Sequence, residues 1–291
     1  EGYSWNDSSY MKQRNKQKPY NSQMSIYELH LGTWMNKPDG TSHKYNELVD
    51  HLIPYLLENG FSHVELMPVT EHPLDQSWGY QGTGYYSATS RYGVPKDLMY
   101  LVDRCHQNGV KVILDWVPGH ICRDDHGLYM FDGEPLYEYT EEWKRENVVW
   151  GTANFDLGRG EVQSFLISNA LFWMKKFHVD GFRIDAVSNI IYYLGDSRHG
   201  VNEGALTFLR ELSTQIFAEF DQALLIAEDS TAYPKVTHPV HEGGIGFNYK
   251  WNMGWMNDTL EYFEKDPVYR KYHHNNITFG LAYAFTENYV L

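Results

Sequence analysis

Apolar residues along the chain form short runs, and between these runs lie longer stretches with an apolar residue every three or four positions. Several of the short runs are apolar at nearly every position, which is typical of parallel strands covered on both faces. The longer stretches have the period of helices. This alternation predicts an α/β fold with a parallel sheet, either open or closed into a barrel. The predicted strands are residues 25–31, 63–69, 110–117, 181–187 and 223–227, with weaker runs at 246–251 and 288–291.

The helical period predicts helices at residues 45–59, 95–109, 161–177 and 203–220. Gly60 and Gly109 are plausible C-terminal stops for the first two. Pro54 inside the first helix predicts a kink or a later start. The first 23 residues are polar and rich in Lys, Gln, Asn and Ser, so we expect residues 1–23 to be a linker or tail. Residues 24–291 are then expected to form one domain.

Composition excludes several classes of protein. Lys and Arg number 24 and Asp and Glu 38, a formal charge of −14, which does not suit binding to nucleic acid or an anionic membrane. No apolar run is long enough to span a membrane. Only two cysteines exclude a disulfide framework, and His120, Cys122 and His126 lack the spacing of a metal site. We therefore expect a cytoplasmic protein without metal or cofactor.

Aromatic residues make up 16% of the chain, and they fit either core packing or stacking on sugar rings. Three predicted strands end in a carboxylate: Asp115, Asp185 and Glu228, the last followed by Asp229. In a parallel α/β barrel, catalytic groups lie at the C-terminal ends of the strands. Each carboxylate alone could be a helix cap or a salt bridge, but three together favour a catalytic site.

Two of these carboxylates have different environments. Arg183 and Asp185 are two residues apart on one strand, so their side chains share a face, and the arginine favours the ionised form of Asp185. Glu228 follows five apolar residues, which favour a raised pKa suited to a general acid. One ionised and one protonated carboxyl is the division of labour in glycoside cleavage. Spacing alone leaves open whether Glu228 or Asp229 faces inward.

These residues stand in motifs that resemble the α-amylase superfamily and, within it, the 1,4-α-glucan branching enzymes. Residues 115–120 (DWVPGH), 181–187 (GFRIDAV) and 227–230 (AEDS) are similar to three of the family's signatures. Residues 71–80 are similar to the donor-site loop after the second strand, and residues 250–256 and 266–270 also resemble branching enzymes. The resemblance covers about residues 24–291 and implies a (β/α)8 TIM barrel.

The resemblance implies a retaining transfer of an α-1,4-linked chain to a glucan 6-hydroxyl, which forms the α-1,6 branches of glycogen. It assigns the nucleophile to Asp185 and the acid/base to Glu228. Arg183 would orient Asp185, and Asp115 would organise Arg183. The other residues expected to bind the α-glucan are His72, Asp75, Trp78, Tyr80 and His120; for Trp78, packing is an equal alternative.

The family's fourth signature, a His-Asp pair, follows the seventh barrel strand. Residues 286–291 resemble that strand, and the sequence then stops. We therefore expect a barrel truncated in the region of strand 7, a third catalytic carboxylate beyond Leu291, and little activity of this chain alone. The alternatives are an amylase-type hydrolase, a non-catalytic glucan-binding module and an unrelated α/β protein with structural carboxylates.

Overall fold

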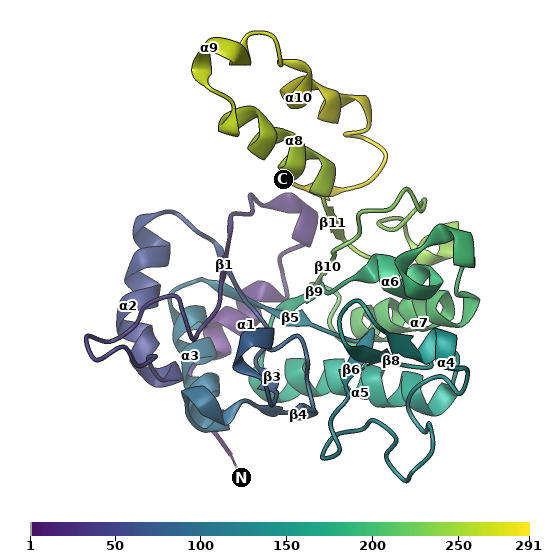
Figure 1. Cartoon of the computed structure of the whole chain (residues 1–291). Helices are drawn as coiled ribbons and strands as arrows, with labels where there is room; N and C mark the ends of the chain where they lie inside the picture. Colours follow the sequence, from purple (N-terminus) through teal and green to yellow (C-terminus); the bar gives the residue numbers. More distant parts are fainter. Residues whose placement is uncertain (1) are drawn as a thin grey trace.

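The computed structural model describes residues 2–291, and its centre is a sheet of seven parallel strands (Figure 1). Their spatial order is β1, β2, β5, β9, β10, β11, β12, which is also their order along the chain. Each strand lies within one of the predicted runs. The sheet has seven strands, and the seventh, β12, has only two residues, so the predicted (β/α)8 barrel truncated in the region of strand 7 is confirmed. The strands are β1 (Ile26–Leu29), β2 (His63–Leu66), β5 (Lys111–Trp116), β9 (Gly181–Ile184), β10 (Leu224–Ala227), β11 (Tyr249–Trp251) and β12 (Tyr289–Val290).

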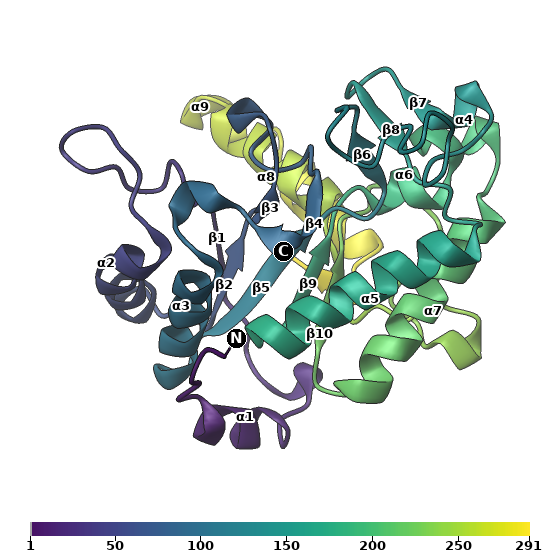
Figure 2. The same cartoon turned by 90° about the horizontal axis from the view of Figure 1, so that it is seen from below.

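The four predicted helices are present, and each connects consecutive strands of the sheet. They are α2 (Tyr45–Glu58), α3 (Pro95–Gln107), α5 (Gly160–Phe177) and α7 (Glu203–Glu219), all on the outer side of the curled sheet (Figure 2). Helix α2 begins at Tyr45 and includes Pro54, so the later start is wrong. Its first turn is closed by Glu47, whose carboxylate accepts the backbone N–H of Lys44.

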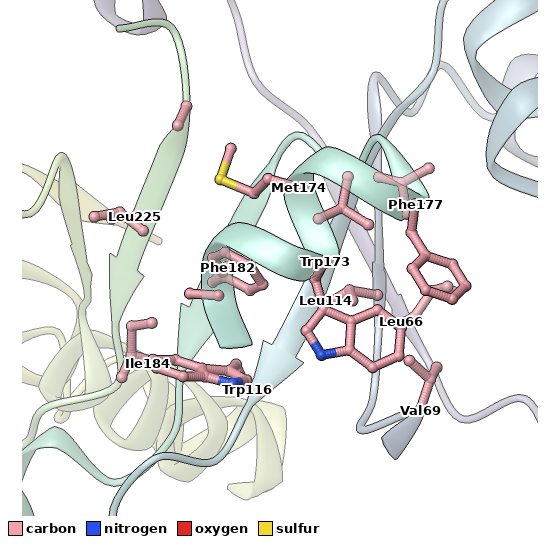
Figure 3. Packing of buried hydrophobic residues seen from close by; sticks show 14 of the residues in the cluster. Leu66, Val69, Leu114, Trp116, Trp173, Met174, Phe177, Phe182, Ile184 and Leu225 are labelled. Atoms are coloured by element: carbon pink, nitrogen blue, oxygen red, sulfur yellow. The ribbon is translucent and has the colours of Figure 1, made fainter. Parts of the chain in front are cut away.

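The two faces of the sheet hold different residues. Leu114 and Trp116 on β5, with Phe182 and Ile184 on β9, point outward and pack against α5, where Trp173 is fully buried (Figure 3). The residues between them on each strand point into the barrel. Ile113, Leu224 and Ile226 form a small apolar group there.

Short elements follow several strands and build the rim of the site. Strands β3 (Thr70–Glu71) and β4 (Gly84–Ala88) pair after β2, and β6 (His120–Cys122), β8 (Thr152–Asn154) and β7 (Glu146–Asn147) form a small sheet after β5. The short helices α4 (Glu142–Arg145) and α6 (Val187–Ile191) lie beside them. The 3-10 turns are Pro19–Asn21, Asp75–Ser77, Ser90–Tyr92, Tyr193–Gly195, Ser197–His199, Val240–Glu242 and Phe279–Ala282.

Residues 2–23, predicted as a linker or tail, include helix α1 (Ser8–Arg14). Asp7 and Arg14 are buried, and Arg14 pairs with Asp180 at the base of β9. Tyr20 packs on Tyr249 of β11, so this segment contacts the barrel as far as residue 20. Sequence polarity does not reveal such packing, because the buried groups are charges whose partners lie far away along the chain. The boundary at residue 23 stays a prediction.

Between β11 and β12 the chain forms α8 (Met253–Glu264), α9 (Pro267–Arg270) and α10 (Asn275–Thr278), which project away from the barrel (Figure 1). Helix α8 has no fully buried residue. Several large apolar side chains of this projection are exposed: Leu260, Phe263, Val268, Tyr269, Tyr272, Phe279, Leu281 and Phe285. Within residues 2–291, no helix combines the length and the apolar character needed to cross a membrane.

Candidate active site

A cleft of about 440 Å³ opens at the C-terminal end of the sheet, where the predicted carboxylates lie. Five of the nine predicted site residues line it: Tyr80, His120, Arg183, Asp185 and Glu228. Because the strands are parallel and in register, residues far apart in sequence reach the same edge. The other lining residues are Ser77, Gln81, Trp150, Thr152, Ala186, Ser188, Asn189, Ser230 and Met253.

The guanidinium of Arg183 joins three carboxylates in this cleft. Its Nη1 lies 2.8 Å from Asp115 Oδ1 and 2.8 Å from Asp185 Oδ1, and its Nη2 lies 3.2 Å from Glu228 Oε2. The indole ring of Trp251 covers the guanidinium at 4.5 Å. Burial favours the neutral form of Arg183, but the three carboxylates raise its pKa well above the usual range, so it stays charged.

Local backbone structure explains how Asp185 and Glu228 come together. Asp185 continues the inward face of β9, two residues after Arg183, as predicted from the period of a strand. The chain then turns at Ala186, whose φ of 48° is in the left-handed region. This turn points the Ala186 N–H at Glu228 Oε2, a hydrogen bond of 2.8 Å. The carboxyl of Glu228 is therefore held over the end of β9.

Asp185 and Glu228 have pKa values shifted in opposite directions. Burial alone would raise the pKa of Asp185, but His120 and Arg183 favour the ionised form and lower it overall. Burial and the nearby charge of Asp185 raise the pKa of Glu228, which Arg183 only partly opposes. The cleft therefore favours an ionised Asp185 beside a Glu228 that can hold a proton, as the sequence predicts.

The structure decides which of the two acidic residues after β10 faces the cleft. Glu228 lines it, whereas Asp229 points away and is fully buried. Asp229 Oδ2 lies 2.8 Å from Nζ of Lys250 on β11, and this buried ion pair neutralises it. Glu228 is therefore the residue available for chemistry.

Asp115 lies directly behind the cleft. It accepts a hydrogen bond of 2.5 Å from the Tyr80 hydroxyl besides those from Arg183. Complete burial raises the pKa of Asp115 to about 7, although Arg183 and Tyr80 favour its ionised form. Asp115 thus contacts two cleft residues, Tyr80 and Arg183, without lining the cleft itself.

His120 and Trp150 form one wall of the cleft. His120 Nε2 is 3.8 Å from Asp185 Oδ2, and its ring centroid is 5.1 Å from that of Trp150. The Trp150 carbonyl accepts a hydrogen bond from Gln81, which ties this wall to the loop after β3. Sequence analysis missed Trp150, because the β6–β8 pairing that brings it to the cleft joins segments without a strand-length apolar pattern.

Besides Asp115, three predicted residues do not line the cleft. His72 is buried, and its Nδ1 is 2.8 Å from the Thr70 carbonyl. Asp75 pairs with Arg91, and the side chain of Trp78 is 54% exposed; both line a neighbouring cavity of about 740 Å³ with the loop after β1. The turn at residues 75–80 therefore separates the two cavities, with Asp75 and Trp78 on one side and Tyr80 on the other.

Glu65 on β2 is a further acidic residue inside the barrel. It is 0% exposed, and neither of its carboxylate oxygens has a hydrogen-bond partner. Burial, with a smaller contribution from Asp115, raises its pKa to about 8 from the usual 4.5. Between pH 4.5 and about pH 8, Glu65 is ionised in the unfolded chain and protonated in the folded chain, so folding takes up a proton.

Replacing Glu65 by Gln should stabilise the chain increasingly as the pH rises from 4.5 to about 8. The wild-type chain loses stability over this range, because its unfolded state releases the proton first, while Gln does not titrate. Compared with the difference between the two chains at pH 4.5, the difference at pH 7 should favour the variant by about 3 kcal/mol more, measured by urea unfolding at several pH values. If the difference in the free energy of unfolding between the two chains did not change with pH, Glu65 could not be a buried neutral acid.

Comparison with known proteins gives matches along the whole chain. A family model described as "Alpha amylase, catalytic domain" matches residues 45–134. The 1,4-alpha-glucan branching enzyme GlgB of Bacillus caldolyticus is 60% identical over 290 residues, which cover 100% of this chain and 44% of that protein. GlgB of Bacillus mycoides (strain KBAB4) is 59% identical over 291 residues, with 100% and 45% covered. The solved Anoxybacillus alpha-amylase has a TM-score of 0.66 at 19% identity, covering 87% of this chain and 58% of that chain.

The chain thus spans less than half the length of the curated relatives it matches. The match to these relatives includes all the strands that carry the cleft residues, and the solved α-amylase has the same barrel fold. The resemblance seen in the sequence motifs is therefore confirmed. The chain is similar over its whole length to the 1,4-alpha-glucan branching enzymes, and its residues 45–134 match the α-amylase catalytic domain.

Proposed function

We propose that this chain supplies the nucleophile and the acid/base of a 1,4-α-glucan branching enzyme. The observation that carries the proposal is the single guanidinium of Arg183 that contacts both Asp185 and Glu228. It holds the two carboxyl groups together at the end of the strands while their pKa values shift apart. This is the arrangement that retaining cleavage of a glycosidic bond needs.

In the first step, Asp185 attacks the anomeric carbon of an α-1,4-linked glucose unit. Glu228 gives its proton to the departing glycosidic oxygen, so a new chain end leaves and a glycosyl ester forms on Asp185. In the second step, Glu228 takes the proton of an acceptor 6-hydroxyl, whose oxygen attacks the anomeric carbon. The ester bond to Asp185 breaks, and the product is an α-1,6 branch with retained anomeric configuration.

The remaining cleft residues position the donor sugar. His120 and Tyr80 present polar groups to the cleft that holds Asp185, and Trp150 offers an aromatic face beside His120. Asp75 and the exposed ring of Trp78 lie in the neighbouring cavity, where they would bind parts of the glucan farther from the reacting bond. His72 is buried, so its role would be to hold this loop rather than the sugar.

The test is to replace the matching stretch of the Bacillus caldolyticus enzyme by these 291 residues and to incubate the purified chimera with amylose. We expect new α-1,6 linkages, detected by their anomeric proton signals, without an equal gain of reducing ends. Reducing ends without branches would favour the amylase-type hydrolase. Glucan binding without any turnover would favour the binding module, and the Trp78→Ala variant would then be expected to lose that binding.

The 291-residue chain by itself is expected to form few or no branches, because its sheet ends at the exposed edge of β12. Branch formation at a rate near that of the chimera would contradict this expectation. A cytoplasmic location, as expected for a glycogen-forming enzyme, also stays a prediction.

A further inference from the structure

A cluster of buried charges lies at the base of the sheet, at the opposite end of the strands from the cleft. It holds residues 2–15 against the barrel. The ring of Trp5 stacks on His178 at 3.8 Å, and the ring of Tyr10 stacks on His106 at 4.0 Å. Asp103 on α3 also accepts hydrogen bonds from this segment, from the Tyr3 hydroxyl and from the Asn6 backbone N–H.

His106, near the end of α3, is the centre of this cluster. Its side chain is 0% exposed, with Nδ1 2.9 Å from Asp7 Oδ2 and Nε2 3.0 Å from Asp180 Oδ2. A carboxylate can only accept hydrogen bonds, so both ring nitrogens must carry a proton. A neutral ring would direct a lone pair at one of the two carboxylates. The geometry therefore requires the imidazolium form.

The surrounding charges lead to the same requirement. Asp180 Oδ1 also accepts from Arg14 Nη1 at 3.0 Å and from the Tyr10 hydroxyl at 2.9 Å. With Asp7 and Asp180 both ionised, Arg14 neutralises only one of them. The proton on His106 supplies the second positive charge, and a buried carboxylate without a partner would be costly.

Other ionisable groups around the cluster do not replace that proton. His178, at the end of α5, also contacts Asp7 Oδ2 at 2.9 Å, but it lies at the edge, with its side chain 21% exposed. Cys105 on α3, Lys111 on β5 and His63 on β2 are in electrostatic range of Asp180 without a hydrogen bond to it. His106 is thus the group that bridges the N-terminal segment to the base of β9.

We propose that this cluster is a pH-sensitive clamp: protonated His106 fastens residues 2–15 to the base of the barrel, and these residues detach when His106 loses its proton. The clamp also reaches the strands of the cleft. Asp180 Oδ2 accepts the backbone N–H of Val112 on β5 at 2.7 Å. Val112 lies three residues before Asp115, and Asp180 lies three residues before Arg183, so the clamp holds the two strands that carry these side chains.

The direction of the pH effect follows from the same contacts. Burial lowers the pKa of His106, but Asp180 and Asp7 raise it by more, so it lies above the ordinary 6.5. A raised pKa means that the stabilisation is fully present below pH 6.5 and is lost as the pH rises through the pKa of the folded chain. Residues 2–15 are therefore expected to detach as the pH rises.

The test is hydrogen–deuterium exchange of residues 2–15 in this chain, expressed as protection factors from about pH 6 to about pH 9. We expect the protection factors to be constant near the acidic end of this pH range and then to fall by up to about tenfold per pH unit as the pH rises. His106→Gln cannot donate to both carboxylates and carries no charge, so it should lack protection at every pH. His241→Gln lies in the turn Val240–Glu242 with its side chain 81% exposed, so it is the matched control and should keep the wild-type profile.

Asp7→Asn gives a second, milder variant that keeps Asp180 and Arg14. It removes one of the two carboxylates that raise the pKa of His106, so the pH of release should fall while the step remains. Protection that does not change with pH in the wild-type chain would overturn the clamp. So would a pH step that persists in His106→Gln. If His106→Gln does not fold, the wild-type profile and the shift in Asp7→Asn decide the question.

Discussion

Replacing Asp185 by Asn in the chimera with the Bacillus caldolyticus enzyme should lower the rate of chain transfer by about 10⁴-fold or more. The amide has nearly the same shape as the carboxylate and can still accept a hydrogen bond from Arg183. It is, however, a poor nucleophile and cannot neutralise the charge that develops on the sugar. The rate is measured as α-1,6 linkages formed from amylose, with glucan binding measured separately to show that the cleft is intact.

The matched control is Asp221→Asn, an exposed carboxylate before β10 at the other end of the barrel. It should leave the rate within about twofold of the unchanged chimera, because surface substitutions away from a site have small effects. If Asp185→Asn kept more than a tenth of the control rate, Asp185 could not be the nucleophile. Glu228 would then be the remaining carboxyl group at Arg183 that lines the cleft.

The strands and main helices could be predicted from the sequence because each has its own local pattern. Strands β5, β9 and β10 are apolar runs that end in a charge, and the charge marks the edge where the cleft lies. The period of two residues placed Arg183 and Asp185 on one face, and the structure confirms this with a hydrogen bond of 2.8 Å. Such patterns can be recognised in the sequence because they follow from the period of a single strand or helix and do not depend on distant residues.

Other features depend on partners that are distant in the sequence. The inward direction of Glu228 could not be predicted, because it depends on Lys250 of the next strand neutralising Asp229. Helix α1 could not be predicted either, because its burial depends on Asp180 and His106 and not on an apolar face. Trp78 and Tyr80 are only two residues apart in the same motif, yet they line different cavities, and the backbone at Trp78 is left-handed, with φ of 53°.

Replacing Glu228 by Gln should lower chain transfer from amylose by about 10²- to 10⁴-fold in the same chimera. Gln has no proton to give to the departing oxygen and cannot take one from the acceptor hydroxyl. Glu242→Gln, in the exposed turn after β10, is the matched control and should not change the rate.

A donor that needs no proton for departure separates the two steps. With a maltosyl fluoride, fluoride leaves without acid assistance, so Glu228→Gln should still form the ester on Asp185 at a rate near that of the unchanged chimera. The second step lacks its base, so the ester should accumulate and be detected as an intact-mass increase of one maltosyl group. Because Arg183 contacts both carboxylates, the variant keeps the positive charge that holds Asp185 in place. An equally slow first step with the fluoride donor, and no accumulated ester, would show that Glu228 acts by holding the site together rather than by transferring the proton.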